Sequence, residues 1–149
     1  LLFSSAHQGM PFYASGTNGF VDVRDVVDIM IKLMDNEVYG QRFIVTAENW
    51  PFRKLIEQMC LALGSTPPRK PLSKKLSGIY WRVEWLHSLI FGVQPAITKE
   101  TVNMVFAKTQ YTNAKIVKEL DYSFIPIEKS IKEFSSFFMA DYRKLKGLD

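Results

Sequence analysis

Residues 16–34 change periodicity once, from that of a strand to that of a helix, and this change constrains the fold more than any other feature of the chain. Phe20, Val21 and Val23 follow a Gly-Thr-Asn-Gly turn with charged residues between them, which predicts a short strand. From Asp25, which is placed to cap a helix, apolar residues recur at helical spacing. This helix should bury a face made of Val26, Val27, Met30, Ile31 and Met34.

A second strand is predicted over residues 42–47, because Phe43, Ile44 and Val45 are consecutive, aromatic or β-branched residues. Three adjacent apolar residues indicate burial on both faces, as at the edge of a parallel sheet covered by helices. Asn49 is placed to cap the helix that follows. The inner face of that helix is expected to contain Leu55, Ile56, Met59, Cys60 and Leu63.

The two ends of the chain also read as helical. The apolar start, Leu1 to Phe3, has no capping residue, and we expect it to finish a helix of a longer chain. Near the other end, apolar residues at helical spacing predict a long terminal helix: Ile127, Ile131, Phe134 and Phe138.

Residues 76–91 form the most aromatic segment and are predicted to be helical. Trp81 and Trp85 lie four residues apart and partly off the main apolar face, so this helix has two contact surfaces. Four interpretations stay open. The segment can be a helix wedged between others, a wall of a substrate pocket, a dimer face or a helix at a membrane interface.

Composition narrows the class of protein. With 149 residues, 47% of them hydrophobic, the chain suffices for one domain with a core, and it shows no second domain boundary. The net charge of +4 comes from dispersed lysines, which favours a solvated basic surface over a nucleic-acid site. A single cysteine, Cys60, excludes an internal disulfide and fits a reducing compartment. No apolar run reaches the ~18 residues of a membrane span, so we expect a cytoplasmic protein.

Several segments, in this order, carry a resemblance to a known family. They are Phe-Val-Asp-Val-Arg-Asp-Val-Val at 20–27, Arg-Phe-Ile-Val-Thr-Ala at 42–47, Asn-Ala-Lys at 113–115 and Ile-Pro-Ile-Glu at 125–128. Together they resemble the C-terminal half of the extended short-chain dehydrogenase/reductases. That family includes NAD(P)-dependent sugar epimerases and dehydratases and dihydroflavonol-reductase-like enzymes.

The resemblance implies an α/β fold: the C-terminal portion of a Rossmann-type protein, mostly helical here, with two or three short strands. It also implies that residues 1–149 are a single substrate-domain fragment and that the dinucleotide-binding part is absent. The parent would use NAD or NADP, and this fragment alone would bind neither and be inactive. A small-molecule substrate and a homo-oligomeric state are the expected partners.

The catalytic elements of that family have no match here. Its phosphate-binding turn opens a helix, whereas the turn at residues 16–19 precedes a strand. Its catalytic pair is a tyrosine and a lysine four residues later. Tyr111 with Lys115 and Tyr142 with Lys146 have this spacing, but both lie too late in the chain and are interpreted as chance matches. We therefore expect no catalytic or metal-binding residue in this chain.

Substrate contact is the function that remains. Nucleotide-sugar enzymes of the family hold a substrate phosphate with an arginine just before the strand, where this chain has Asn18 or Gly19. Without a guanidinium there, a smaller carbonyl or alcohol substrate is favoured. We expect Tyr13, Asn18 and Phe20 to lie nearest the substrate. The alternative function is a helical protein-interaction module that uses residues 76–91.

Overall fold

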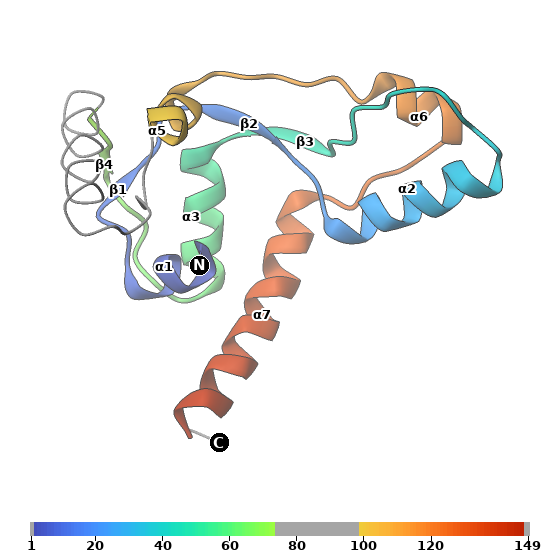
Figure 1. Ribbon diagram of the computed structural model, residues 1–149. Coiled ribbons are helices and arrows are strands. Elements are labelled where there is room, and N and C mark those ends of the chain that lie inside the picture. The colour runs from blue at the N-terminus through green and yellow to red at the C-terminus, as the bar shows by residue number, and fades with distance from the viewer. Residues whose placement is uncertain (1, 74–98, 148–149) are drawn as a thin grey trace, which may run out of the picture.

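The computed structural model describes residues 2–73 and 99–147. The fold in these ranges is mixed α/β and mainly helical (Figure 1). The helices are α1 (Leu2–Gln8), α2 (Val23–Asp35), α3 (Phe52–Ala62), α5 (Lys99–Phe106), α6 (Ala114–Leu120) and α7 (Ile127–Lys146). The strands are β1 (Phe12–Tyr13), β2 (Thr17–Phe20), β3 (Glu48–Pro51) and β4 (Lys70–Pro71).

The short strands form two separate pairs. β1 pairs with β4 in parallel, and β2 pairs with β3 in antiparallel register from Thr17 opposite Pro51 to Phe20 opposite Glu48. The free edge of β2 is covered by the segment after α5, because Thr17 exchanges backbone hydrogen bonds with Ala107 and Thr109. A mostly helical chain with a few short strands was predicted, and the described residues have this character.

Glycine is required at the position just before β2. A Cβ on the buried Gly16 would lie 2.7 Å from the carbonyl oxygen of Val105 and closer still to that of Ala107. Backbone atoms cannot yield as a flexible side chain can. The absence of a side chain therefore lets the segment after α5 approach β2 closely enough for hydrogen bonding.

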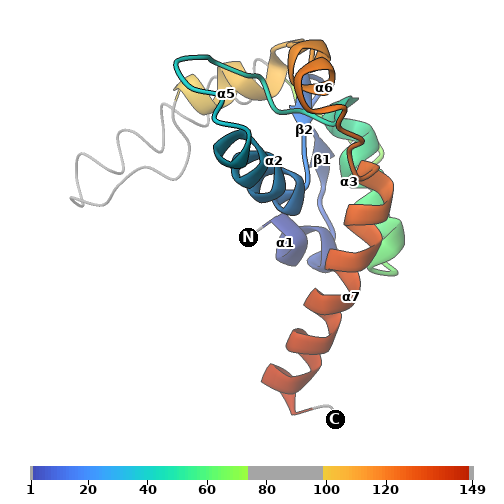
Figure 2. The same ribbon diagram turned by 90° about the vertical axis from the view of Figure 1, so that its right-hand side faces the viewer.

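The core lies where α3 meets α1 and α7 (Figures 1 and 2). The predicted inner face of α3 is confirmed in full, and Cys60 is a fully buried free thiol within it. Helix α3 ends at Ala62 with Leu63 as its C-cap, and Gly64 follows with a φ of +69°. The core consists of Ala6, Trp50, Leu55, Ile56, Met59, Cys60, Leu63, Ile127 and Ile131.

Helix α2 differs from its prediction in two ways. It starts earlier, at Val23, and Asp22 rather than Asp25 caps it, accepting a hydrogen bond of 2.9 Å from the backbone N–H of Arg24. The strand before it likewise ends at Phe20 instead of continuing to Val23. Of the expected buried face, Val26 is half-buried and the other four residues are exposed. The residues buried on α2 are Asp25 and Ile29.

The strand predicted over residues 42–47 is wrong, because the structure places no strand there. The partner of β2 is instead β3, which follows directly. The earlier residues are held by side chains: Asn113 Nδ2 donates to the Thr46 carbonyl at 2.7 Å and Lys115 Nζ to that of Arg42 at 3.2 Å. A strand needs a neighbouring backbone, and composition alone does not provide one.

Two asparagines lie near helix starts, and the first, Asn49, was predicted to cap α3. Asn49 lies in β3 and does not cap α3, whose N-cap position is occupied by Pro51. Asn113 occupies the N-cap position of α6, but its side chain bonds to Thr46 instead of capping the helix. Both amides link segments that are distant in sequence, a use that local sequence cannot indicate.

Helix α7 packs on α3 along its first turns and on α1 farther along, where the Phe138 and Tyr142 rings meet that of His7. Only its C-terminal end projects away from the body in both views (Figures 1 and 2). Residues 76–91 lie outside the described residues. Within residues 2–73 and 99–147, none of the helices combines the length and the hydropathy that crossing a membrane requires.

Candidate functional site

The first turn of α3 lies between two of the three residues predicted to contact substrate. The guanidinium carbon of Arg53 lies 5.2 Å from the centre of the Tyr13 ring, and the Phe52 ring meets that of Phe20 edge to face at 5.8 Å. Tyr13 and Phe20 are half-buried and also pack against the core. Their rings therefore help to fix the start of α3.

Asn18, the third predicted residue, is also half-buried and lies opposite Trp50 in the β2–β3 pair. Residues opposite one another share a face of the ladder, and so do alternate residues of one strand. Asn18 is therefore on the same face as Phe20 and the buried Trp50. The structure thus places Asn18 and Phe20 on the core side of the β2–β3 pair. Tyr13 lies apart from them, against Arg53 in the first turn of α3.

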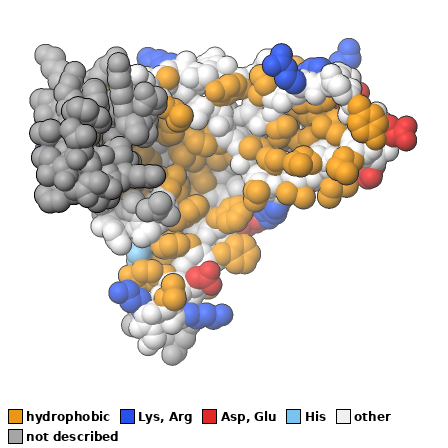
Figure 3. Space-filling model, in the orientation of Figure 1, with side chains coloured by type: hydrophobic (Ala, Val, Ile, Leu, Met, Phe, Trp, Pro, Cys, Tyr) orange, Lys and Arg blue, Asp and Glu red, His pale blue; other side chains and the backbone are white. Residues whose placement is uncertain are grey.

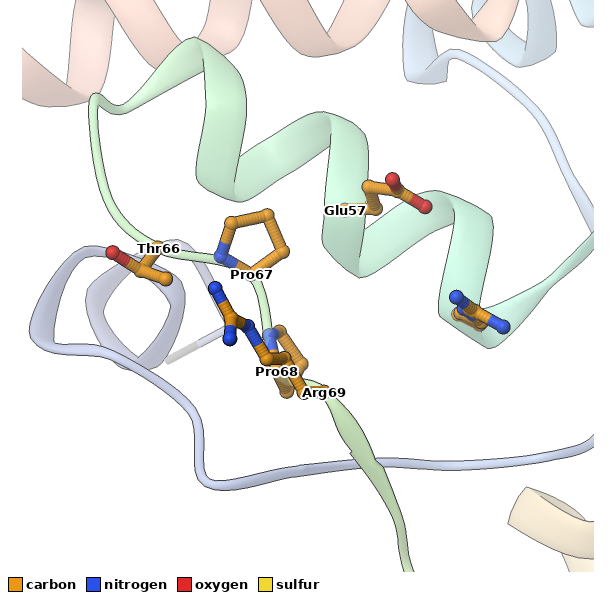
Figure 4. A pocket seen from close by; sticks show the side chains of 6 residues that line it. Glu57, Thr66, Pro67, Pro68 and Arg69 are labelled. Atoms are coloured by element: carbon orange, nitrogen blue, oxygen red, sulfur yellow. The ribbon is translucent and has the colours of Figure 1, made fainter.

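A hollow of about 250 Å³ adjoins this group on the outer side of α3, and Arg53 belongs to both. Pro67, Pro68 and Arg69 supply one side of it from the segment that leads into β4, and Glu57 lies across on α3 (Figure 4). Sequence reasoning did not single out this hollow. Its two arginines lie 16 residues apart, and no local pattern indicates that the chain brings them to one rim.

The chemistry of the hollow is mixed. Arg53 and Arg69 could bind a carboxylate or a phosphate, since guanidinium groups bind such anions through paired hydrogen bonds. The Glu57 carboxylate on the same rim would repel a bound anion, and the side chains of Arg53, Arg69 and Glu57 are all exposed. An exposed and partly neutralised rim gives a weak, salt-sensitive contact.

The start of α2 is anchored to α7 through a buried carboxylate. Asp22 accepts two hydrogen bonds from the Arg24 side chain, at 3.0 and 2.7 Å, and one from the Ser130 hydroxyl. Arg24 also pairs with Glu133 of α7 at 2.7 Å, so two carboxylates engage its guanidinium. The Arg24 guanidinium, with help from Ser130, holds the pKa of the Asp22 carboxyl well below its usual range.

A second buried carboxylate, Asp25, anchors the next turn of α2. It accepts hydrogen bonds from the Tyr122 hydroxyl and the Ile125 backbone N–H, both at 3.0 Å. Burial raises the pKa of the Tyr122 phenol, and the neighbouring Asp28 and Asp25 raise it further. A phenol held neutral in this way donates a structural hydrogen bond and is a poor proton-transfer group at neutral pH.

Members of the two tyrosine–lysine pairs with the family's spacing make other contacts. Lys115 Nζ lies 4.5 Å from the centre of the Phe43 ring and donates to the Arg42 carbonyl. Tyr142 of α7 meets the His7 ring at 4.8 Å. Across the two described ranges, no group of three or more His, Cys, Asp or Glu residues could hold a metal ion.

The glycines at residues 16–19 do not fit a dinucleotide. Gly16 faces the carbonyl oxygens of Val105 and Ala107, and Gly19 faces the side chains of Thr46 and Tyr111. A phosphate cradle presents backbone N–H groups at the start of a helix, whereas the groups here are occupied within the β2 pairing. No phosphate group could approach these glycines closely.

Comparison with known proteins identifies the fold alone. No protein-family model matches the sequence, and no curated protein matches it. Among solved structures, the crystal structure of gox2253 is similar, with a TM-score of 0.71 and 23% sequence identity. The match covers 95% of this chain and 43% of gox2253, so this chain spans less than half the length of that protein.

Proposed function

We propose that this chain is the substrate-binding part of a longer NAD(P)-dependent oxidoreductase or epimerase of the extended short-chain dehydrogenase/reductase type. The residues of the chain would bind and orient a small carbonyl or alcohol substrate. Hydride transfer and proton transfer would depend on residues of the parent protein outside this chain, and the chain alone would be inactive. The protein would work in the cytoplasm as a homo-oligomer.

The observation that carries the proposal is that the family-like segments meet one another in space. Asp25, from residues 20–27, bonds to the backbone N–H of Ile125, from residues 125–128. Asn113, which begins the Asn-Ala-Lys segment, bonds to Thr46, from residues 42–47. Segments that hold one fold together would be retained together, so their joint resemblance is more informative than any single segment.

Size supports the same proposal. More than half of gox2253 lies outside the part that matches this chain, so a protein of that size has room for a coenzyme-binding half. Gly16 and Gly19, in the turn before β2 and in β2 itself, are closed to a dinucleotide. A coenzyme would therefore bind to another part of such a protein.

Isothermal titration calorimetry tests the proposal most simply. We expect NADP and NAD to give no binding heat with this chain. The polypeptide from the whole reading frame that contains it should bind one of them at micromolar concentration. Micromolar binding to this chain alone, or none to the longer polypeptide, would contradict the proposal.

The substrate residues are tested in the longer enzyme. Tyr13→Phe removes a hydroxyl and Asn18→Ala removes an amide, and each should lower kcat/KM by about tenfold if it orients the substrate. Leu145→Ala, at an 86% exposed position near the C-terminal end of α7, is the control. An unchanged kcat/KM in both variants would remove Tyr13 and Asn18 from the site.

A further inference from the structure

Helix α2 exposes a continuous apolar face. Five side chains, at positions 23, 27, 30, 31 and 34, lie on one side of the helix because of their spacing, and we call this set the α2 face. Each is more than half exposed, from 52% at Val27 and Ile31 to 68% at Met34. Figure 3 shows hydrophobic side chains gathered over this end of the molecule. The complete set is Val23, Val27, Met30, Ile31 and Met34.

The helix is fixed rigidly behind this face. Asp22 and Asp25, each 2% exposed, hold its first turns to α7 and to the segment after α6. Helix α6 packs beside it, and Asn36 closes its C-terminal end by donating to the Lys32 carbonyl. Burying two carboxylates is costly unless they are fully hydrogen-bonded, as they are here. The fold thus holds the α2 face in one orientation, as a preformed binding surface requires.

The charges on α2 argue against a membrane as the occupant. Helices that lie on anionic membranes are rich in Lys and Arg. Helix α2 carries two cations, Arg24 and Lys32, against three carboxylates, Asp25, Asp28 and Asp35. Arg24 and Lys32 are paired with Asp22 and Asp28. The face itself has no charge, so its partner must be apolar as well.

The dimensions favour a β-sheet as the occupant. The 13 residues of α2 span about 18 Å, which matches the length of a strand of about five or six residues, along which a helix of an α/β protein packs. Helices of α/β proteins bury one face on a sheet, and the sheets in the described ranges have two strands each. The matched solved structure leaves 57% of its own chain for further structure, since the match covers 43% of it.

We propose that the α2 face is the docking surface for the apolar face of a multi-stranded β-sheet in the remainder of a longer polypeptide that contains this chain. This inference rests on the proposed function, because the sheet is that of the coenzyme-binding half. It identifies the contact that joins the two halves.

Met30→Glu tests the surface, with Leu145→Glu as the matched control at an exposed apolar position near the far end of α7. In this chain both variants should change the unfolding equilibrium constant by only about twofold, because both sites face water. In the longer polypeptide, Met30→Glu should raise it by about 100-fold, since an unpaired carboxylate would be buried against the sheet. Leu145→Glu should remain neutral. Urea unfolding followed by circular dichroism measures the unfolding equilibrium constant of each variant in each polypeptide. If Met30→Glu prevents folding of the longer polypeptide, while Met30→Glu in this chain and Leu145→Glu in both polypeptides still fold, that result also supports the proposal.

Two results would overturn the inference. One is an equally small effect of Met30→Glu in both polypeptides. The other is a dimer of this chain, seen by sedimentation, that Met30→Glu converts to a monomer, because the occupant would then be a second copy. The proposed function is tested separately by NADP titration. A longer polypeptide that shows the Met30→Glu effect but binds no dinucleotide would refute the proposed function and leave the docking surface supported. A reading frame that encodes no more than this chain would refute both proposals.

Discussion

Helices α3 and α2 have similar apolar stripes in sequence and opposite environments in the fold. The stripe of α3 is buried between α1 and α7, with Met59 at 2% exposure. The stripe of α2 faces outward, with Met30 at 58%. Periodicity therefore shows which face of a helix is apolar but does not show whether the same chain covers it.

The two helices are also held by different forces. Van der Waals packing and burial of apolar surface hold α3, whereas buried carboxylates and their hydrogen-bond donors hold the start of α2. We interpret α2 as a helix fixed by polar anchors on one side so that its apolar side is free for a partner. The predictions below test this contrast.

The largest effect is expected in the core. Met59→Ala should reduce the free energy of unfolding by about 3 kcal/mol, because it removes a buried side chain and leaves a cavity. Urea unfolding measures the change. A loss below about 1 kcal/mol would mean that the α1–α3–α7 core is loosely packed.

The second largest loss of stability is expected when the buried carboxylate of Asp25 is removed. Asp25→Ala leaves the Tyr122 hydroxyl and the Ile125 N–H without an acceptor and should cost about 2 kcal/mol. Asp25→Asn can still accept one of these bonds and should recover part of the loss. The matched surface change, Asp28→Ala, removes a solvent-exposed ion pair with Lys32 and an interaction with Tyr122 but leaves no buried group without a partner, so it should cost much less. Equal costs for Asp25→Ala and Asp28→Ala would contradict the role of Asp25 as an anchor.

The acid dependence of stability should report Asp22. Its pKa is lowered in the folded state by Arg24, so its contribution is complete above the unfolded-state pKa of about 4 and is lost as the pH falls below that value. Unfolding midpoints between about pH 5 and pH 2 should therefore fall less steeply in Asp22→Asn than in the wild type. Parallel curves would show that Asp22 contributes no pH dependence.

The smallest effect is expected on the α2 face. Met30→Ala should change the stability of this chain by less than about 0.5 kcal/mol, because the side chain faces water. Paired with Met59→Ala, it compares the same substitution in the two stripes. A cost near that of Met59→Ala would mean that Met30 is buried by something in this chain.

Sequence alone predicted elements whose partners are local or have a strong pattern. The inner face of α3 and the long terminal helix α7 were both anticipated. The register of β2 with β3 was missed because it depends on a pairing 30 residues apart. The composition of residues 42–47 favoured a strand, but within this range the backbone bond to β2 is made by Ala47, at its end, and no strand forms. The hollow beside Arg53 had no local signal, because spatial proximity alone unites its residues.

Methionine oxidation tests the central claim most directly, because exposure controls the reaction of methionine with peroxide. In this chain Met30 and Met34, which are 58% and 68% exposed, should oxidise much faster than the buried Met59. In the polypeptide of the whole reading frame, peptide mass spectrometry should show Met30 and Met34 slowed by about tenfold or more, toward the rate of Met59. Equal rates for Met30 and Met34 in the two polypeptides would show that nothing in the longer protein covers the α2 face.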